Sequence, residues 1–454
     1  MKLVSRNPAT EQREALFQTL TARQIAQSIA TAQRAYSLWS SLTIRQRTEK
    51  IAILAQLIHK RKQILAEIIT REMGKPITEA RAELEKCAIC CEYYITNATQ
   101  FLQIKKIKTE AKASYVRYDP LGIILAIMPW NFPWWQVIRC AIPALTAGNV
   151  VMLKHASNVP RCARAIHTLF HEAGFPQGVF MNIPITSAEL APLIQHPALA
   201  GISLTGSVAA GKSIAALAAS SLKKIVLELG GSDPFIVLDD ASLEVAARTA
   251  VQARMLNAGQ SCIAAKRFIV TKRRAKEFES LFVTTMQSLI VGNPLNIATQ
   301  VGPLARADLL EILDKQVMRA IKQGAKVALG GFRKEGLGYY YMPTVLTNIT
   351  RQMTIATEEV FGPVACIYMV TNTEEAIALA NNTHFGLGAS IWSENRKRAE
   401  YLAAKIQGGV VSINTKVYSD PRLPFGGIKD SGIGRELGEE GLKEFVNVKT
   451  VIIN

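Results

Sequence analysis

Long apolar runs are missing from this 454-residue sequence. The longest, residues 121–130, is far shorter than the ~20 residues that a membrane-spanning helix needs. The first twelve residues also lack the apolar segment that is typical of a signal peptide. We therefore expect no membrane partner and a cytoplasmic location.

Cysteines are few and do not form pairs along the chain. Their number, seven, is odd and they are widely spread, which predicts reduced thiols in a reducing compartment. Cys87, Cys90 and Cys91 form a cluster, which raises the possibility of a metal site. No histidine lies nearby and no second CxxC pair follows, so the sequence favours buried helix residues and no metal.

Acidic residues are fewer than basic ones, 36 against 53, which gives a formal net charge of +17. A nucleic-acid surface is one interpretation of this excess. The Lys and Arg residues are dispersed, however, and no nucleic-acid-binding motif accompanies them. A basic field that attracts an anionic cofactor and a small anionic substrate explains the charge equally well. We expect a small-molecule substrate and no nucleic-acid partner.

The pattern along the chain predicts an α/β protein of two or three domains. Amphipathic helices are expected before residue 104, the longest at residues 45–71 and 78–101. Polar and apolar residues alternate at 105–118, as in a strand or hairpin. From residue 121 short apolar strands alternate with helices, which indicates a parallel sheet. The apolar end, residues 450–453, predicts a strand that requires a neighbour, for which another subunit is one candidate.

Cys262 is placed like a nucleophile, because small and polar residues flank it and no apolar run surrounds it. Glu228 opens the Gly230-Gly231 turn, from which a carboxylate can reach into a pocket as a base. The alternatives are an inert buried thiol and a carboxylate that caps a helix or turn. Together the two residues suggest covalent thiol chemistry followed by assisted hydrolysis.

Six short motifs follow one another along the chain: PWNFP at 129–133, LTGS at 204–207, ELGG at 228–231, GQSC at 259–262, EEVFGP at 358–363 and PFGG at 424–427. With these motifs the sequence resembles the NAD(P)-dependent aldehyde dehydrogenase superfamily over essentially its whole length. Within that superfamily it is most similar to the shorter, NADP-preferring succinate-semialdehyde dehydrogenases of bacteria.

The resemblance implies a fold with three parts. A Rossmann-type cofactor-binding domain is expected at residues 1–104 and 119–227, and an α/β catalytic domain at 228–430. A small β arm, residues 105–118 and 431–454, is expected to join subunits into a homodimer or homotetramer.

The resemblance also implies the catalytic roles. Cys262 would add to the aldehyde, and the resulting thiohemiacetal would pass a hydride to a nicotinamide. The side-chain amide of Asn131 and the backbone N–H of Cys262 would hold the oxyanion, although a simple turn residue is the alternative for Asn131. Because Glu228 is present to activate water, we expect hydrolysis of the thioester and not transfer to coenzyme A.

The stretch 206–211, GSVAAG, follows a strand and opens a helix, but it lacks the full GxGxxG spacing and is a weak signal alone. The resemblance implies that Phe361 packs near the nicotinamide and that Glu359 holds its ribose. The full set of implied cofactor contacts is Trp130, Asn131, Lys154, Ser157, Gly206, Ser207, Val208, Leu229, Glu359 and Phe361.

Cofactor choice depends on Ser157. NAD-preferring relatives commonly carry Glu there, and that carboxylate would repel a 2′-phosphate. A serine removes the repulsion and Lys154 adds positive charge, so we predict NADP, with NAD as the weaker possibility. The alternative is that Ser157 only caps the next helix.

The substrate side is predicted from Trp135 and Arg139, which lie four residues apart on the helix after Pro133 and so share a face. They would form an aromatic wall and an anchor for a distal carboxylate. Ser261 and Ser419 would add hydroxyl groups, with Arg422 nearby. An ordinary salt bridge is the alternative for Arg139.

Two positions differ from many relatives. Cys140 stands where a lysine is common, and we interpret it as a packed thiol. Some succinate-semialdehyde dehydrogenases carry a second cysteine two residues after the nucleophile, but Ala264 stands there, which excludes a local disulfide switch.

The sequence thus predicts oxidation of succinic semialdehyde to succinate with reduction of NADP. One alternative is a dehydrogenase of another aliphatic or carboxylated aldehyde that uses NAD or NADP. The other is a catalytically silent basic binding protein, against which the presence of Cys262, Glu228 and Asn131 argues.

Overall fold

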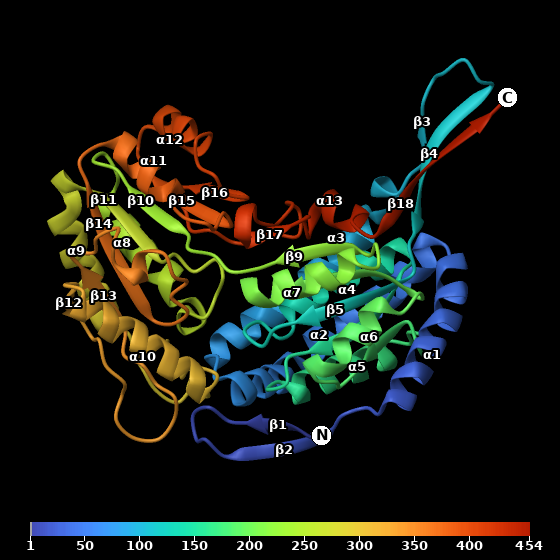
Figure 1. Cartoon of the computed structure of the whole chain (residues 1–454), viewed down its shortest axis with the longest axis horizontal. Coiled ribbons are helices and arrows are strands. Elements are labelled where there is room, and N and C mark those ends of the chain that lie inside the picture. Colours follow the sequence, from blue (N-terminus) through green and yellow to red (C-terminus); the bar gives the residue numbers. More distant parts are fainter. Residues whose placement is uncertain (1) are drawn as a thin grey trace.

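The computed structural model describes residues 2–454. Two large sheets, each covered by helices, lie side by side, and a narrow antiparallel arm projects from one of them (Figure 1). The chain passes from the first large sheet to the second between Glu228 and Pro234. An α/β architecture with mainly parallel strands is therefore confirmed.

The N-terminal part is a hairpin followed by three long helices. The elements are β1 (Lys2–Arg6), β2 (Arg13–Gln18), α1 (Ala22–Ser41), α2 (Ile44–Met73) and α3 (Ile77–Phe101). Thr21 and Thr43 form capping boxes at the starts of α1 and α2. The two long helices expected at 45–71 and 78–101 are confirmed within one residue at each start.

The first large sheet has the order β17-β9-β8-β5-β6-β7. Its strands are β5 (Ile123–Met128), β6 (Val150–His155), β7 (Phe180–Asn182), β8 (Leu199–Thr205), β9 (Lys224–Glu228) and β17 (Gly432–Ile433). Its helices are α4 (Trp135–Ala147), α5 (Pro160–Glu172), the 3-10 turn η1 (Ser187–Glu189), α6 (Leu190–Gln195) and α7 (Val208–Ala219).

This strand order places a switch point between β5 and β8. The chain moves outward from β5 to β6 and β7, and then returns to the other side of β5 for β8 and β9, all of them parallel. At such a point the loops after the two strands diverge and leave a crevice, in which open α/β sheets bind their ligands.

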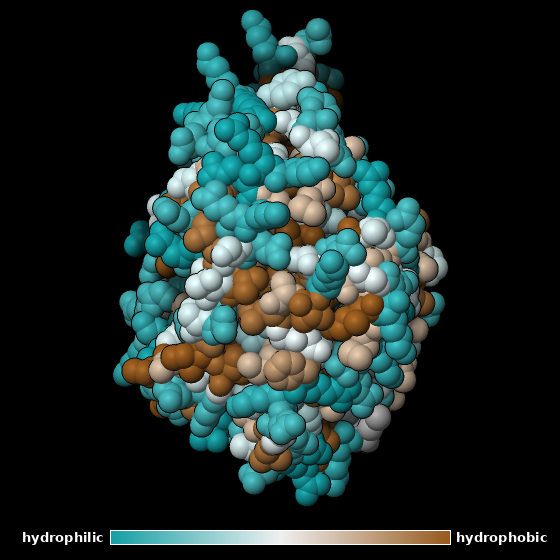
Figure 2. All heavy atoms as spheres, turned by 90° about the vertical axis from the view of Figure 1, so that its left-hand side faces the viewer, coloured by the Kyte–Doolittle hydropathy of each residue, from teal (hydrophilic) through white to brown (hydrophobic). Residues whose placement is uncertain are grey.

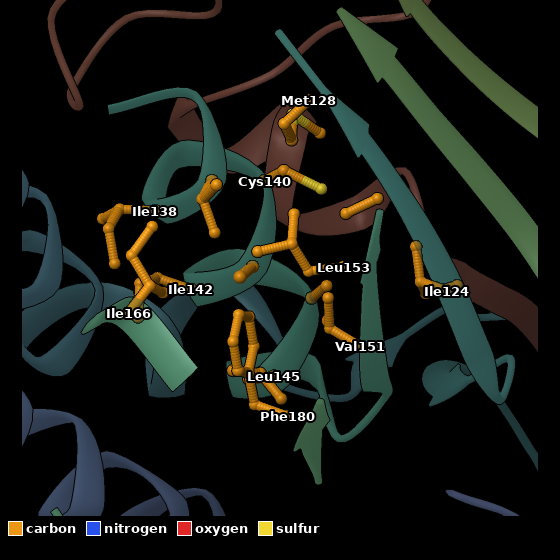
Figure 3. Packing of buried hydrophobic residues seen from close by; sticks show 14 of the residues in the cluster. Ile124, Met128, Ile138, Cys140, Ile142, Leu145, Val151, Leu153, Ile166 and Phe180 are labelled. Atoms are coloured by element: carbon orange, nitrogen blue, oxygen red, sulfur yellow. The ribbon is translucent and has the colours of Figure 1, made fainter. Parts of the chain in front are cut away.

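Apolar packing against this sheet fixes the position of α4 (Figure 3). Ile138 and Leu145 of α4 belong to the same buried cluster as Val151 and Leu153 of β6, and all four side chains are fully buried. The Cys140 sulfur points into the same core, where burial raises the pKa of the thiol to about 12. The interpretation of Cys140 as a packed thiol is confirmed, and α4 is a rigid support for the residues at its start.

The second large sheet has the order β12-β13-β14-β11-β10-β15-β16, in which only β12 is antiparallel to its neighbour. Its strands are β10 (Pro234–Val237), β11 (Arg267–Thr271), β12 (Lys326–Leu329), β13 (Thr344–Thr347), β14 (Val364–Val370), β15 (Gly388–Trp392) and β16 (Val410–Ile413). Its helices are α8 (Leu243–Met255), α9 (Lys272–Gln287), α10 (Ala307–Lys322), α11 (Thr373–Asn381) and α12 (Arg396–Ala403).

Three 3-10 turns and a short helix complete the chain. They are η2 (Leu256–Gly259), η3 (Thr354–Ala356), η4 (Lys429–Ser431) and α13 (Gly438–Lys443).

The arm is a sheet of the order β18-β4-β3, formed by β3 (Lys105–Lys106), β4 (Ala113–Pro120) and β18 (Val446–Ile453). The terminal strand β18 pairs with β4 along its whole length, so its neighbour comes from the same chain. The outer edge of β18 remains open, and Val448 and Ile452 are more than half exposed. The strand expected at 105–118 is confirmed, while the proposed domain boundaries stay a prediction.

The surface and the cysteines of α3 bear on whether the chain has a membrane-spanning helix or a metal site. The face seen in Figure 2 is mostly hydrophilic, with apolar side chains in smaller patches. Within residues 2–454 no helix is both long and apolar enough to cross a membrane. Cys87, Cys90 and Cys91 are fully buried in α3, and no cluster able to hold a metal ion occurs in the same described part of the chain.

Candidate active site

Two cavities meet at Cys262. The first, of about 380 Å³, lies at the carboxyl ends of β5, β8 and β9, where Asn131, Gly206 and Gly230 border it. The second, of about 240 Å³, lies between α3, α4 and the segment 416–425. Cys262 and Gln136 border both cavities. Cys262 therefore borders a cavity on either side.

The loop that carries Cys262 has an unusual backbone. Asn257 and Ala258 have φ values of 55° and 53°, a left-handed conformation that costs energy for residues other than glycine. Gly259 is also left-handed, and a Cβ there would lie 2.1 Å from the Gly362 oxygen. The fully buried Arg254 donates to the carbonyl oxygens of Gly259 at 2.6 Å and of Gly362 at 2.8 Å, which holds this backbone in place.

Lys266 holds the other side of the loop. Its ammonium donates to the carbonyl oxygens of Ser261, Cys262 and Ala264 at 2.8–3.1 Å, and it lies 3.7 Å from Glu359 Oε1. Burial lowers the pKa of Lys266, and Glu359 opposes that shift. The lysine thus connects the nucleophile loop to a residue that borders the first cavity.

Asn131 is oriented by two hydrogen bonds. Its Nδ2 donates to the Gln260 oxygen at 3.0 Å, and its Oδ1 accepts from Gln136 Nε2 at 3.1 Å. An amide nitrogen carries two hydrogens, so a second one remains for a ligand. This geometry suits the predicted oxyanion donor.

Cys262 is the one cysteine of the chain that is not fully enclosed. The surrounding protein nevertheless desolvates its sulfur and raises the pKa of the thiol to about 12, and the nearby charges of Arg139 and Lys266 oppose this. At neutral pH the resting group is therefore a thiol, and its reaction with an aldehyde requires removal of the proton.

Glu228, at the end of β9, carries a buried carboxyl group whose two oxygens have no hydrogen-bond partner within residues 2–454. Burial raises its pKa well above the usual range, Glu436 adds to this, and Arg139 opposes it. Gly426 makes room for it, because a Cβ there would lie 2.7 Å from Glu228 Oε1. The carboxyl group borders neither of the two cavities in this conformation.

The first cavity brings together most of the predicted cofactor residues. Trp130, Asn131, Gly206, Ser207, Leu229, Glu359 and Phe361 all border it. The rings of Trp130 and Phe361 meet edge to face, with centroids 5.9 Å apart. Ser207 caps the start of α7 by accepting the Ala210 N–H, so the helix N-terminus lies at the cavity.

Lys154, Ser157 and Val208 do not border this cavity. Lys154 lies in β6, beside β5, and Ser157 follows two residues after the end of β6. In the Rossmann arrangement the end of the second strand lies near the adenosine ribose. Burial lowers the pKa of Lys154, which Glu189 opposes. The roles of these three residues stay predictions.

The second cavity is bordered by all four predicted substrate residues, Trp135, Arg139, Ser261 and Ser419. Arg139 is buried in an ion pair with Glu436 and donates to Thr205 Oγ1 at 3.2 Å. The salt bridge that was its alternative is thus present, and its role as a carboxylate anchor stays a prediction. Arg422 lies outside this cavity, paired with Asp420 at 2.7 Å.

Several residues of the site were not predicted from the sequence. Arg254, Lys266 and Glu436 are charged side chains that are almost completely buried. A buried charge needs partners, and here most of the partners are backbone oxygens or distant residues that no local pattern reveals. Gln136 lies in α4, beside the predicted substrate residue Trp135, and no pattern in the sequence marked it.

The pKa of Cys262 leads to a test by alkylation. Because the thiolate is the reactive form and the pKa is raised to about 12, we expect the rate of modification by iodoacetamide to rise about tenfold per pH unit between pH 7 and 10. Mass spectrometry of the labelled chain checks both the rate and the site. Cys262→Ala should remain unlabelled, and a rate that levels off below pH 8 would contradict the raised pKa.

Comparison with known proteins identifies the family of this chain. A succinate semialdehyde dehydrogenase [NAD(P)+] from Escherichia coli is 44% identical, over 99% of this chain and 97% of its own. A probable succinate-semialdehyde dehydrogenase [NADP(+)] from Synechocystis is 47% identical over the full length of both chains. The crystal structure of succinic semialdehyde dehydrogenase from Streptococcus pyogenes with NADP+ superposes with a TM-score of 0.98 over 99% of each chain, at 36% identity. The family model for aldehyde dehydrogenases matches residues 1–451, and the chain belongs to the aldehyde dehydrogenase family.

Proposed function

We propose that this enzyme oxidises succinic semialdehyde to succinate and reduces NADP. The observation that carries the proposal is the position of Cys262, which borders both cavities. A nucleotide can approach the sulfur from one side and an aldehyde from the other. The relatives named above, from Synechocystis, Escherichia coli and Streptococcus pyogenes, support the substrate and the cofactor.

The first cavity fits a dinucleotide. It lies at the switch point of the sheet, the N-terminus of α7 opens toward it, and an N-terminus of this kind stabilises phosphate groups. Glu359 and Phe361 would hold the nicotinamide end, and Lys154 and Ser157 the ribose with its 2′-phosphate. The bound cofactor supplies the acceptor for a hydride.

The reaction begins at Cys262. When its thiol has lost its proton, the sulfur adds to the aldehyde carbon, and the carbonyl oxygen becomes negatively charged. The free hydrogen of Asn131 Nδ2 and the backbone N–H of Cys262 are positioned to stabilise that charge. The position of Asn131 is fixed before the substrate arrives, because Gln136 and Gln260 hold its amide.

Glu228 would complete the reaction. After the hydride has left, the acyl group is bound to Cys262 as a thioester, and water must attack it. In its ionised form a carboxylate with a raised pKa is a stronger base than usual, and with no fixed partner it is suited to accept a proton from that water. The same side chain is also able to accept the proton of the Cys262 thiol.

We also propose the domain roles, assembly and location predicted from the sequence. The open edge of β18 and its exposed Val448 and Ile452 support a homodimer or homotetramer formed through the arm. The seven free cysteines support the reducing conditions of the cytoplasm.

An aldehyde panel tests the proposal as a whole. Absorbance at 340 nm reports formation of the reduced cofactor with succinic semialdehyde, glutaric semialdehyde and butanal. We expect the highest kcat/KM for succinic semialdehyde with NADP. A preference for butanal would favour another aldehyde as substrate, and activity with none of them would favour a silent binding protein.

Glu228→Gln tests the base. Without the carboxylate the thioester cannot be hydrolysed efficiently, so we expect a rapid burst of up to one NADPH per chain and a steady-state rate about 1,000-fold below that of the wild type. Stopped-flow absorbance at 340 nm measures both phases. If the burst were lost together with the steady state, Glu228 would be required before hydride transfer as well.

Ser157→Glu tests the choice of cofactor. A carboxylate there would repel the 2′-phosphate, so we expect kcat/KM for NADP to fall about 30-fold and kcat/KM for NAD to stay within about threefold. Ser157→Ala is the matched control and should keep the preference for NADP. Equal effects of Ser157→Glu on both cofactors would place Ser157 away from the 2′-phosphate.

A further inference from the structure

Lys86 lies where the second cavity opens to the outside. An outer pocket of about 550 Å³ adjoins this cavity, and Lys86 and Ser419 border both. Cys262, in contrast, lies where the same cavity meets the first one. The second cavity therefore has the nucleophile at its inner end and a lysine at its outer end.

We propose that Lys86 is the specificity-determining residue that binds the distal carboxylate of the aldehyde. The inference rests on the proposed function, because it assumes a substrate with a carboxylate at the far end from the aldehyde. The anchor predicted from the sequence was Arg139.

The ammonium of Lys86 has no carboxylate partner within 4.0 Å in the described chain, residues 2–454. Its Nζ donates to Ser419 Oγ at 2.6 Å and lies 4.2 Å from the centre of the Trp135 ring. Neither contact supplies a negative charge, although the side chain is partly buried. The charge of Asp420 also acts on Lys86, but the Asp420 carboxylate is paired with Arg422 at 2.7 Å. Burial, and next the charge of Arg139, lower the pKa of Lys86 to about 8. An anion bound at this position would raise the pKa of Lys86 again, because a nearby negative charge favours the protonated ammonium.

Arg139 also borders this cavity, but its positive charge is already paired within the protein. Glu436 forms a buried ion pair with it, and Thr205 accepts one of its hydrogens. A substrate carboxylate would have to compete with Glu436 for the same guanidinium. Lys86 faces no such competitor, so the geometry favours Lys86 as the anchor and Arg139 as a source of positive potential.

The two carboxylates that border the cavity, Glu83 and Glu79, already have partners within the protein. Glu83 is paired with the buried Lys75 and accepts the N–H groups that begin α4. Glu79 accepts the Asn257 N–H, and burial raises its pKa to about 7. Lys416 also borders the cavity, and its charge acts on Glu79.

Ser261 supplies a second indication of a polar ligand. Its side chain is 1% exposed, and its Oγ has no hydrogen-bond partner within residues 2–454 although it borders the same cavity. A buried hydroxyl group of this kind is stabilised by an acceptor on a ligand. The aromatic rings of Phe132 and Trp135 form apolar walls of the cavity, which suit a short methylene chain.

The test compares a carboxylated aldehyde with a neutral one of equal length. Wild type, Lys86→Met and Lys86→Arg are assayed with succinic semialdehyde and butanal, in the full enzyme with saturating NADP. For Lys86→Met we expect kcat/KM for succinic semialdehyde to fall about 30-fold, mostly through KM, and kcat/KM for butanal to change less than threefold. Lys86→Arg keeps the charge and should restore most of the preference.

Two further variants separate this role from others. Lys60→Met removes one exposed positive charge on α2 and should leave both kcat/KM values unchanged, which excludes a general effect of net charge. Arg139→Gln leaves Glu436 buried without its partner, so both aldehydes should be affected alike. The affinity of each variant for NADP, measured by fluorescence, shows that the fold is intact.

Each outcome decides the inference. A wild type without preference for succinic semialdehyde would overturn the proposed function and this inference with it. A wild-type preference that persists in Lys86→Met would overturn the inference alone. If Arg139→Gln, and not Lys86→Met, lost activity selectively for succinic semialdehyde, the anchor would be Arg139. If Lys86→Met did not fold, Lys86→Gln removes the same charge and keeps a polar end; a lost preference in this variant would support the inference, and a preference that persists would overturn it.

Discussion

The position of the Cys262 thiol depends on a buried clamp of two cations on backbone oxygens. Arg254 and Lys266 gather carbonyl groups from the nucleophile loop, and Arg254 also reaches the Gly362 oxygen on a separate loop. Their hydrogen bonds offset the cost of two residues in the left-handed conformation. Without these hydrogen bonds the strained loop would not be held in its position between the two cavities. The position of the nucleophile thus depends on two side chains that border neither cavity.

Desolvation also affects the two reactive groups of this site, Cys262 and Glu228. It raises the pKa of the thiol and of the Glu228 carboxyl group, so both are held in their uncharged forms more strongly than in water. The thiol must give up its proton to react and the carboxyl group must be free to take one, which connects the two residues functionally. Arg139 opposes both shifts, because it is the positive charge that acts on each of them.

Arg139 and Lys86, two of the three cations that border the substrate cavity, differ in their partners. Arg139 is neutralised by Glu436, whereas Lys86 interacts with a hydroxyl group and an aromatic ring and keeps its charge for a ligand. A charged side chain that is already paired within the protein contributes to the electrostatic potential of the cavity but forms few directional hydrogen bonds with a ligand. For this reason a basic residue in the correct pocket is not by itself an anchor.

Much of the molecule could be predicted from the sequence. The 3.6-residue period predicted α2 and α3 almost to their ends, and short apolar strands separated by helices predicted the parallel sheets, because these periodicities are local properties. The motifs around Cys262, Glu228 and Asn131 identified the family. Only the tertiary structure decided that β18 pairs with β4 of its own chain and that Arg139 meets Glu436. It also decided that Lys86 has no carboxylate within 4.0 Å among residues 2–454. These contacts join residues from distant parts of the chain, so no pattern along the sequence contains them.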